Sequence, residues 1–426
     1  MLADLDEVLL PGVTHWHHPA FFGYFPCNAS GPAVLGDLLS GGLGLQGMLW
    51  ATSPACTELE SLVADWLVEL LGLPEHFRSS GPGGGVIQDS ASSASLVALL
   101  AALHRASGGR VVREGITTRC AAYASAHAHS SIEKAAGIAG MGRDNVREVA
   151  VDPDTLAMDP GHLDELLARD RADGVLPVFV CATVGTTSTT AVDPVAEIAA
   201  VCREHGVWLH VDAAYAGVAA VCPELRGINE GVERADSYVT DPHKWLLTNF
   251  DCSLLWVADR APLLGALSIV PEYLRNEASE SGAVVDHRDW QVPLGRRFRA
   301  LKLWSVVRHY GREGLRAHIR SGVAMAAELA EHVDGDEHFA LLARPRFGLV
   351  CFRPLWPDEP GGQDGDARTA ELLRRVNASG ELLLTHTAAH GRIQLRMAIG
   401  ATSTERRHVL AAWQRVREEQ ALLRQS

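Results

Sequence analysis

The stretch VLPVFVCATVGTTSTTAVDPVAEIAAVCREHGVWLHVD, residues 175–212, holds two apolar runs separated by an amphipathic segment. The runs at 175–183 and 207–211 are short and rich in valine, which is typical of buried strands. Residues 194–205 between them have helical spacing, so the order is strand, helix, strand. Such a unit joins parallel neighbours through a crossover helix, and we predict an α/β fold with a mostly parallel sheet covered by helices. Further strands of this sheet are expected at 121–125, 237–239 and 253–257.

The chain of 426 residues is long enough for a large domain and a smaller one. We expect an N-terminal segment at 1–57, a large domain at 58–310 and a small α/β C-terminal domain at 311–426. Thr57 and Glu60 have the spacing of a capping box, which predicts that a helix begins at Thr57. The C-terminal domain is expected to contain strands at 347–352, 381–387 and 393–399 and a helix at 369–376.

The bulk composition narrows the class of protein. The formal net charge is −14, and an acidic surface argues against binding to nucleic acid or to an anionic membrane. No apolar run approaches the ~18 residues that a membrane span needs, and no basic, apolar leader is visible, so we expect a cytoplasmic protein. None of the eight cysteines forms a C-x-x-C pair, so neither a metal site nor a disulfide framework is expected.

The segment Asp241-Pro242-His243-Lys244-Trp245 follows an expected strand and places a lysine beside apolar residues. Lysine is rarely buried, and a desolvated amine becomes a usable nucleophile toward a carbonyl group. The alternative is a surface lysine whose aliphatic stem lies over Trp245. Taken alone, the segment favours neither interpretation.

Asp212 stands at the C-terminal end of an expected strand, where open α/β sheets bind ligands. A carboxylate there suits the pyridine nitrogen of pyridoxal 5′-phosphate (PLP), which must stay protonated for the ring to accept electrons. Ala214 is small enough for a flat ring to lie against the backbone. A helix N-cap aspartate is the ordinary alternative, and it is the better one unless a reactive lysine accompanies Asp212.

Two further segments offer groups for such a cofactor. Ser90-Ala91-Ser92 at a helix start supplies N–H groups, hydroxyls and the positive end of the helix dipole, although an ordinary serine-capped helix has the same sequence. His129 has the flat ring needed to stack on a cofactor, and it also suits a substrate carboxylate. A metal site that pairs it with His127 is not supported, because no third ligand follows at helical spacing.

Taken together, these segments resemble the group II PLP-dependent decarboxylases, and within them the aromatic-L-amino-acid decarboxylases. The likeness extends from about residue 13 to about residue 415. Each piece alone is a weak signal, whereas the ordered combination is highly specific. The matching stretches are THWHHPAFFGYFP, SPACTELE, GGGVIQDSASSASLVALLAAL, HAHSSIEKA, VGTTSTTAVDP, WLHVDAAYAG, DPHKWLLTNFDCS, PEYLRN and QVPLGRRFRALKLW.

The resemblance implies a fold type I PLP enzyme, similar to aspartate aminotransferase, that forms a homodimer with its active sites at the interface. It also implies that an aromatic L-amino acid is converted to the amine and CO₂. By position, Lys244 would bind PLP covalently and Asp212 would pair with the pyridinium nitrogen. Ala214 and His129 would contact the two faces of the ring, and Tyr273 would protonate the substrate carbon after CO₂ leaves. The other cofactor-binding positions would be Ala91, Ser92 and Asp241 at the phosphate, Thr187 near the ring, and His243.

The expected substrate pocket departs from the family pattern in part. Cys27 stands where the animal enzymes that decarboxylate catechols have threonine, and Gln46 and Met48 replace an aliphatic and an aromatic residue. Gly295 is similar to the members that are specific for aromatic substrates. We therefore expect an aromatic substrate without a catechol preference. The retained pocket residues are Trp16, Tyr24, Phe25, Pro26 and His129.

Two more departures concern the cofactor and the dimer. Asp241 stands where the animal members have asparagine, and a carboxylate beside a phosphate is repulsive unless a cation or a backbone group intervenes. The match begins almost at Met1, whereas family members carry about one more helical hairpin before it. A chain that is short at this end is expected to dimerise less tightly.

Two other functions stay open at this point. An aldehyde synthase on the same scaffold couples decarboxylation to oxidative deamination, and in the family this goes with replacement of the loop tyrosine or the stacking histidine. Tyr273 and His129 are both present, so the amine is the expected product. The second alternative is a non-catalytic relative that binds PLP or only keeps the fold, which Asp241 and the short N-terminus suggest.

Overall fold

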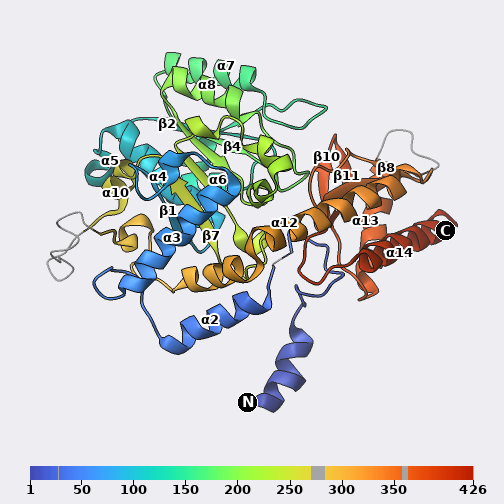
Figure 1. The fold of residues 1–426 in the computed structure, drawn as a ribbon. Coiled ribbons are helices and arrows are strands. Elements are labelled where there is room, and N and C mark those ends of the chain that lie inside the picture. The colour runs from blue at the N-terminus through green and yellow to red at the C-terminus, as the bar shows by residue number, and fades with distance from the viewer. Residues whose placement is uncertain (27, 270–283, 357–362, 426) are drawn as a thin grey trace. The chain divides into compact units, whose positions relative to one another are not determined.

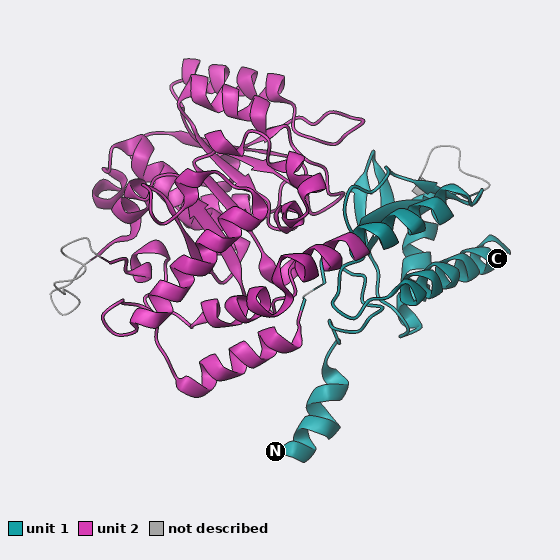
Figure 2. Ribbon diagram, in the orientation of Figure 1, with its two compact units in different colours: residues 1–28, 322–426 teal, residues 29–321 magenta. Residues whose placement is uncertain are grey.

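The computed structural model describes the chain except for residues 27, 270–283, 357–362 and 426 (Figure 1). The described residues form two compact units, coloured separately in Figure 2. Unit 2 is residues 29–321, and unit 1 combines residues 1–28 with residues 322–426.

The boundaries expected after residues 57 and 310 stay predictions, and the contacts divide the chain at other places. Residues 1–28 belong to unit 1 because they pair with its C-terminal segment. Phe21 forms a β-bridge with Leu383, and the Asn28 amide donates a hydrogen bond of 2.9 Å to the Gly400 carbonyl.

Unit 2 is built on a seven-stranded sheet in the order β1-β7-β6-β5-β4-β2-β3. Strands β3, β2, β4, β5 and β6 are parallel to one another, and β7 pairs antiparallel with both β6 and β1. The predicted α/β class with a mostly parallel sheet is thus confirmed. The strands are β1 Gly84–Gln88, β2 Cys120–Ser125, β3 Val146–Val149, β4 Leu176–Thr183, β5 Trp208–Asp212, β6 Ser237–Thr240 and β7 Ser253–Val257.

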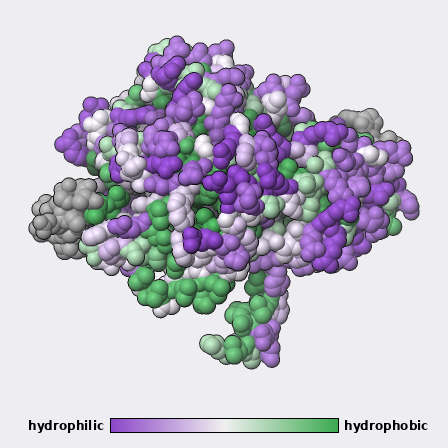
Figure 3. Space-filling model, viewed as in Figure 1, coloured by the Kyte–Doolittle hydropathy of each residue, from purple (hydrophilic) through white to green (hydrophobic). Residues whose placement is uncertain are grey.

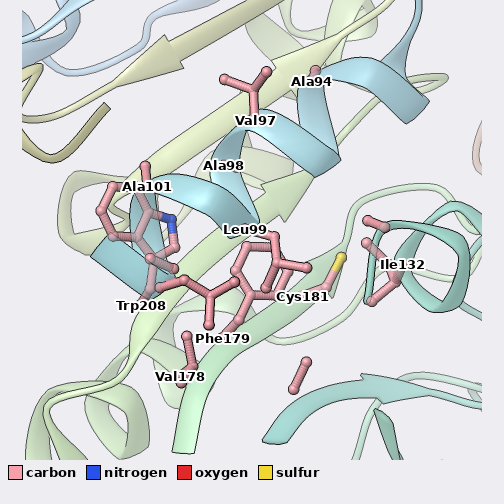
Figure 4. Close-up of a cluster of buried hydrophobic side chains, with 14 of the residues drawn as sticks. Ala94, Val97, Ala98, Leu99, Ala101, Ile132, Val178, Phe179, Cys181 and Trp208 are labelled. Carbon is pink, nitrogen blue, oxygen red and sulfur yellow. The ribbon is translucent and has the colours of Figure 1, made fainter. Parts of the chain in front are cut away.

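Helices cover this sheet, and apolar side chains fill the space between. Figure 4 shows α4 (Ala91–Ser107) lying across the sheet, where Val97 and Leu99 join Phe179 and Trp208 in one buried cluster. The long element α12 (Arg299–Asp334) is interrupted at Gly311, whose φ of 57° is not helical. The other helices of unit 2 are α2 Gly31–Leu43, α3 Pro54–Leu71, α5 Val111–Glu114, α6 Ser131–Ile138, α7 Pro160–Ala172, α8 Val195–His205, α9 Pro242–Trp245 and α10 Ala261–Leu267.

The predicted start of the first long helix is wrong. α3 begins at Pro54, because proline is favoured at the first helical position, where no backbone N–H is needed. Thr57 and Glu60 therefore lie inside the helix and cannot form a capping box. Glu60 is buried instead, accepts a hydrogen bond of 2.8 Å from the Ile87 N–H and forms an ion pair with Arg296.

Unit 1 has its own antiparallel sheet in the order β10-β11-β9-β8 and a separate apolar core. The short strand β8 was not expected, since three residues are too few for a periodic pattern. The strands are β8 Phe339–Leu341, β9 Leu349–Pro354, β10 Thr385–Ala389 and β11 Arg392–Ala398. The helices are α1 Leu2–Asp4, residues 322–334 of α12, α13 Gln363–Ala378 and α14 Arg406–Gln425.

Candidate active site

The ends of two parallel strands bring two of the predicted catalytic residues, Asp212 and Lys244, together in unit 2. Asp212 is the last residue of β5, and Asp241 directly follows its neighbour β6. The Asp241 N–H donates a hydrogen bond of 2.9 Å to the Ala214 carbonyl, which ties the two strand ends to each other. Lys244 lies in the short helix α9 that follows, at the sheet edge where α/β folds place their ligands.

The Lys244 amine forms an ion pair with Asp241. Its Nζ lies 2.9 Å from Asp241 Oδ2, and the side chains are 27% and 2% exposed. His243 Nε2 lies 3.7 Å from the same oxygen. His243 is held by the backbone of Cys252, whose N–H lies 3.0 Å from Nδ1. Burial lowers the pKa of His243, so this ring is neutral near pH 7.

Asp212 and His129 complete the cluster of titratable groups. Asp212 Oδ1 accepts a hydrogen bond of 3.0 Å from the Ala214 N–H. Burial raises the pKa of Asp212, and the positive charge of Lys244 opposes this shift. Burial lowers the pKa of His129, because it disfavours the charged form of the ring. The Nδ1 atom of His129 accepts a hydrogen bond of 3.2 Å from the Ser131 N–H. The remaining proton of the neutral His129 ring is therefore on Nε2.

The start of α4 lies after β1 and offers backbone N–H groups. Ser90 caps the helix by accepting a hydrogen bond of 3.3 Å from the Ser93 N–H. Ala91 and Ser92 are half-buried in the first turn, where N–H groups have no partner within the helix. Thr187, in the loop after β4, is exposed.

The sequence analysis did not identify Tyr215 and Asp251, two residues that lie in the same stretches as Asp212 and Lys244. The Tyr215 ring stacks on Trp245 with centroids 5.0 Å apart, and Trp245 is fully buried. Asp251 is held by two hydrogen bonds of 3.0 Å from Arg299. The stretches that carry Lys244 and Asp212 also contain Tyr215 and Asp251, but neither residue follows a pattern that indicates chemistry.

Three predicted pocket residues form a second set in unit 2. Gln46 Oε1 accepts hydrogen bonds from the N–H groups of Met48 at 3.0 Å and Arg296 at 3.1 Å. A β-carbon on Gly295 would lie 3.5 Å from Gln46 Nε2, so these two residues are neighbours. Gln46 and Gly295 line a cavity of about 420 Å³ together with Gln88, Asp89 and other residues.

The aromatic residues of the predicted pocket lie in unit 1. Trp16 stacks on Tyr24 with ring centroids 5.4 Å apart, and the Arg396 guanidinium lies 5.3 Å from the centroid of Phe25. Pro26 is buried. Two other predicted site residues, Cys27 and Tyr273, lie outside the described residues.

Within the described part of the chain, no group of three histidine, cysteine or acidic side chains is arranged to hold a metal ion. Among the same residues, no helix has both the length and the apolar character needed to cross a bilayer.

A family model, the pyridoxal-dependent decarboxylase conserved domain, matches residues 1–354. The chain belongs to this family of decarboxylases. It is 49% identical over 424 residues to a phenylacetaldehyde synthase of Arabidopsis thaliana, covering 99% of this chain and 86% of that one. It is also 46% identical over 427 residues to the aromatic-L-amino-acid decarboxylase of Sus scrofa, covering 98% and 85%. The crystal structure of an Oryza sativa TDC with PLP and tryptamine matches with a TM-score of 0.95 and 43% identity, over 99% and 87%.

The site of this pyridoxal-dependent decarboxylase has the groups that PLP needs. Lys244 would offer an amine for the aldehyde, and Asp212 would offer a buried carboxylate for the ring nitrogen. The start of α4 offers N–H groups for the phosphate. Asp241 Oδ1 is a buried oxygen for which the described residues supply no hydrogen-bond partner, as in a site built around another group.

Proposed function

We propose that this decarboxylase converts an aromatic L-amino acid to the corresponding amine and CO₂. The observation that carries the proposal is the Lys244 amine, set beside Asp241, Asp212 and His129 at the carboxyl edge of the sheet. Support comes from the identity of 46% to an aromatic-L-amino-acid decarboxylase over nearly the whole chain.

PLP, when bound, withdraws electrons from the bond between the substrate α-carbon and its carboxylate. In the proposed roles, Lys244 holds the cofactor and Asp212 keeps the ring nitrogen protonated. Ala214 and His129 enclose the ring, and a neutral His129 adds no second positive charge beside Lys244. The cofactor contacts proposed at the phosphate and ring edge are Ala91, Ser92, Asp241, His243 and Thr187. The proposed pocket residues are Trp16, Tyr24, Phe25, Pro26, Cys27, Gln46, Met48 and Gly295.

The direct test is to incubate the PLP-loaded protein with tryptophan, 5-hydroxytryptophan, phenylalanine, tyrosine and DOPA. Each turnover releases one CO₂ and adds one proton to the α-carbon, so amine and CO₂ should appear in equal amounts. Absence of amine from every one of these substrates would contradict the proposal.

An aldehyde synthase is the second candidate, because the phenylacetaldehyde synthase of Arabidopsis thaliana is 49% identical to this chain. That reaction consumes O₂ and water and releases aldehyde, CO₂, ammonia and hydrogen peroxide. Peroxide and ammonia in amounts equal to CO₂ would therefore favour the synthase over the decarboxylase.

Tyr273 provides a sharper experiment, since we propose that its phenol protonates the substrate carbon after CO₂ has left. Tyr273→Phe removes this proton donor and should shift the products from amine toward aldehyde and peroxide, with at least a ~10-fold change in their ratio. The measurement is the amine-to-aldehyde ratio of both proteins with one aromatic substrate. An unchanged ratio would rule out this role for Tyr273.

A homodimer is the assembly that we propose, and α2 provides its support. Five apolar side chains on this helix are between 51% and 68% exposed, and they appear as the green area over α2 in Figure 3. The opposite side of α2 packs closely on α12, since a β-carbon on Gly36 would lie 2.7 Å from Lys302 Cα. An apolar surface of this kind marks a protein interface, and we propose a second copy of the chain as the partner. The exposed residues are Val34, Leu35, Leu38, Leu39 and Leu43.

The double substitution Leu38→Glu and Leu39→Glu should weaken this dimer by at least ~100-fold, because it would bury unpaired charges at the interface. Analytical ultracentrifugation over a range of concentrations measures the effect. Leu422→Glu is the matched control, since Leu422 is 56% exposed on α14 and lies outside the proposed interface. A dimer that is equally stable in all three proteins would exclude α2 from the interface.

We also propose that the enzyme acts in the cytosol. All seven cysteines among the described residues are buried and none forms a disulfide bond, in keeping with a reducing compartment.

A further inference from the structure

The two carboxylate oxygens of Asp241 differ in their partners. Asp241 is 2% exposed, and its Oδ2 lies 2.9 Å from the Lys244 amine. Its other oxygen, Oδ1, is buried and accepts no hydrogen bond from the described residues. A buried carboxylate with so few partners depends on its cation, and the attraction is strong because little water screens it.

Among the described residues, two histidines and one further carboxylate face this pair, and neither histidine is a competing cation near pH 7. His243 Nε2 lies 3.7 Å from Asp241 Oδ2, but burial lowers the pKa of His243. Burial also lowers the pKa of His129. Asp212, from the end of β5, adds a second carboxylate near Lys244. Within this cluster, both carboxylates therefore favour a positive charge on Lys244.

We propose that Asp241 holds Lys244 as an ammonium in the cofactor-free protein, so that loading of PLP requires release of a proton from this pair. The inference rests on the proposed function, because it needs Lys244 to be the amine that binds PLP. Asp241 is then a positioning residue that acts through Lys244.

The chemistry of loading explains why the charge matters. An ammonium has no lone pair, and so the nitrogen must first give up one proton to solvent. The neutral amine then condenses with the aldehyde to form a carbon–nitrogen double bond, and one water molecule is released. No oxidant or reductant is needed. A carboxylate 2.9 Å away opposes the first of these steps, while it holds the nitrogen at a fixed place in the site.

The experiment compares the wild-type protein with Asp241→Asn, which keeps the size of the side chain and removes its charge. Cofactor-free protein is mixed with PLP, and separately with pyridoxal, and the visible absorbance is followed over time at several pH values. Near pH 7 the variant should load at least ~10-fold faster with both aldehydes, because an adjacent anion raises the pKa of an amine by about one unit or more. The pH midpoint of its loading rate should lie at least ~1 unit lower.

Asp236→Asn is the matched control. Asp236 directly precedes the same strand, β6, at its opposite end, and it also forms an ion pair, with Arg105 at 2.5 Å. This variant should load at the wild-type rate. Asp241→Ser also removes the charge and should reproduce the faster loading, which guards against a folding defect specific to asparagine.

Two results would overturn the inference. Equal loading rates and equal pH midpoints in wild type and both Asp241 variants would show that the carboxylate does not hold the ammonium. A faster rate with PLP but not with pyridoxal would show that Asp241 acts by repelling the phosphate. Borohydride fixation of PLP to Lys244 in the wild-type protein tests the proposed function separately. Fixation with unchanged rates refutes this inference alone, whereas failure of fixation refutes the proposed function.

Discussion

Lys244→Ala is expected to abolish amine formation, with a loss on the order of 10⁴-fold or more, because it removes the amine that we propose to bind PLP. The same variant should show no visible absorbance band with added PLP. It should also lose about 2 kcal/mol of unfolding free energy, since Asp241 would keep a buried charge without its cation. This cost lies below the range for fully buried pairs because Lys244 is 27% exposed.

Lys244→Arg separates the nucleophile from the charge. A guanidinium stays protonated and can face Asp241, but it does not condense with an aldehyde, so activity should again be lost while stability is largely kept. The chain contains only three lysines, Lys134, Lys244 and Lys302, which makes chemical mapping simple. Lys302 is fully buried, and Lys134 is exposed on α6. Borohydride should fix PLP to Lys244, and Lys134→Ala should change neither labelling nor activity. Amine production by either Lys244 variant would contradict its role.

The fold of unit 2 could be predicted because its strands are buried on both faces. A continuous apolar run such as residues 175–183 leaves few other structures open, and the predicted strands overlap β2, β4, β5, β6 and β7. The predicted capping box was wrong because it relied on a local pattern, Thr57–Glu60. The charge of Glu60 is instead compensated by Arg296, which lies far away in the sequence. Pairing of this kind depends on the tertiary fold and leaves no periodic signal.

The geometry of the site was only partly accessible from the sequence. Sheet topology explains why Asp212 and Lys244 come together, since β5 and β6 are parallel neighbours whose carboxyl ends meet at one edge. The spacing of residues could not show that Asp241 contacts the Lys244 amine at 2.9 Å. It could not show either that Trp245 is buried under Tyr215, because side-chain packing of this kind is a property of the assembled fold.

Asp212→Asn is expected to lower the turnover number by about 10²- to 10³-fold, the usual effect of removing one electrostatic group from a transition state. A neutral amide cannot keep the pyridine nitrogen protonated, so the ring would accept electrons poorly. The asparagine keeps the size of the side chain and can still accept the Ala214 N–H, so the fold should be unaffected. The measurement is the turnover number of the PLP-saturated variant with its best aromatic substrate.

Asp212→Asn is also expected to stabilise the cofactor-free protein, which is the opposite of losing a residue that only supports the fold. Because burial raises the pKa of Asp212 above its ordinary 3.8, the cofactor-free protein loses stability as the pH rises above that value and the carboxyl group ionises. Asp212→Asn removes this loss. The cofactor-free variant should therefore unfold at a higher temperature than wild type near pH 7, and the difference should shrink as the pH falls toward 4.

PLP should raise the unfolding temperature less in the variant, since a protonated ring nitrogen no longer compensates a buried negative charge. A cofactor-free variant that is less stable than wild type near pH 7 would mean that Asp212 supports the fold, and that its buried charge is already compensated without the cofactor.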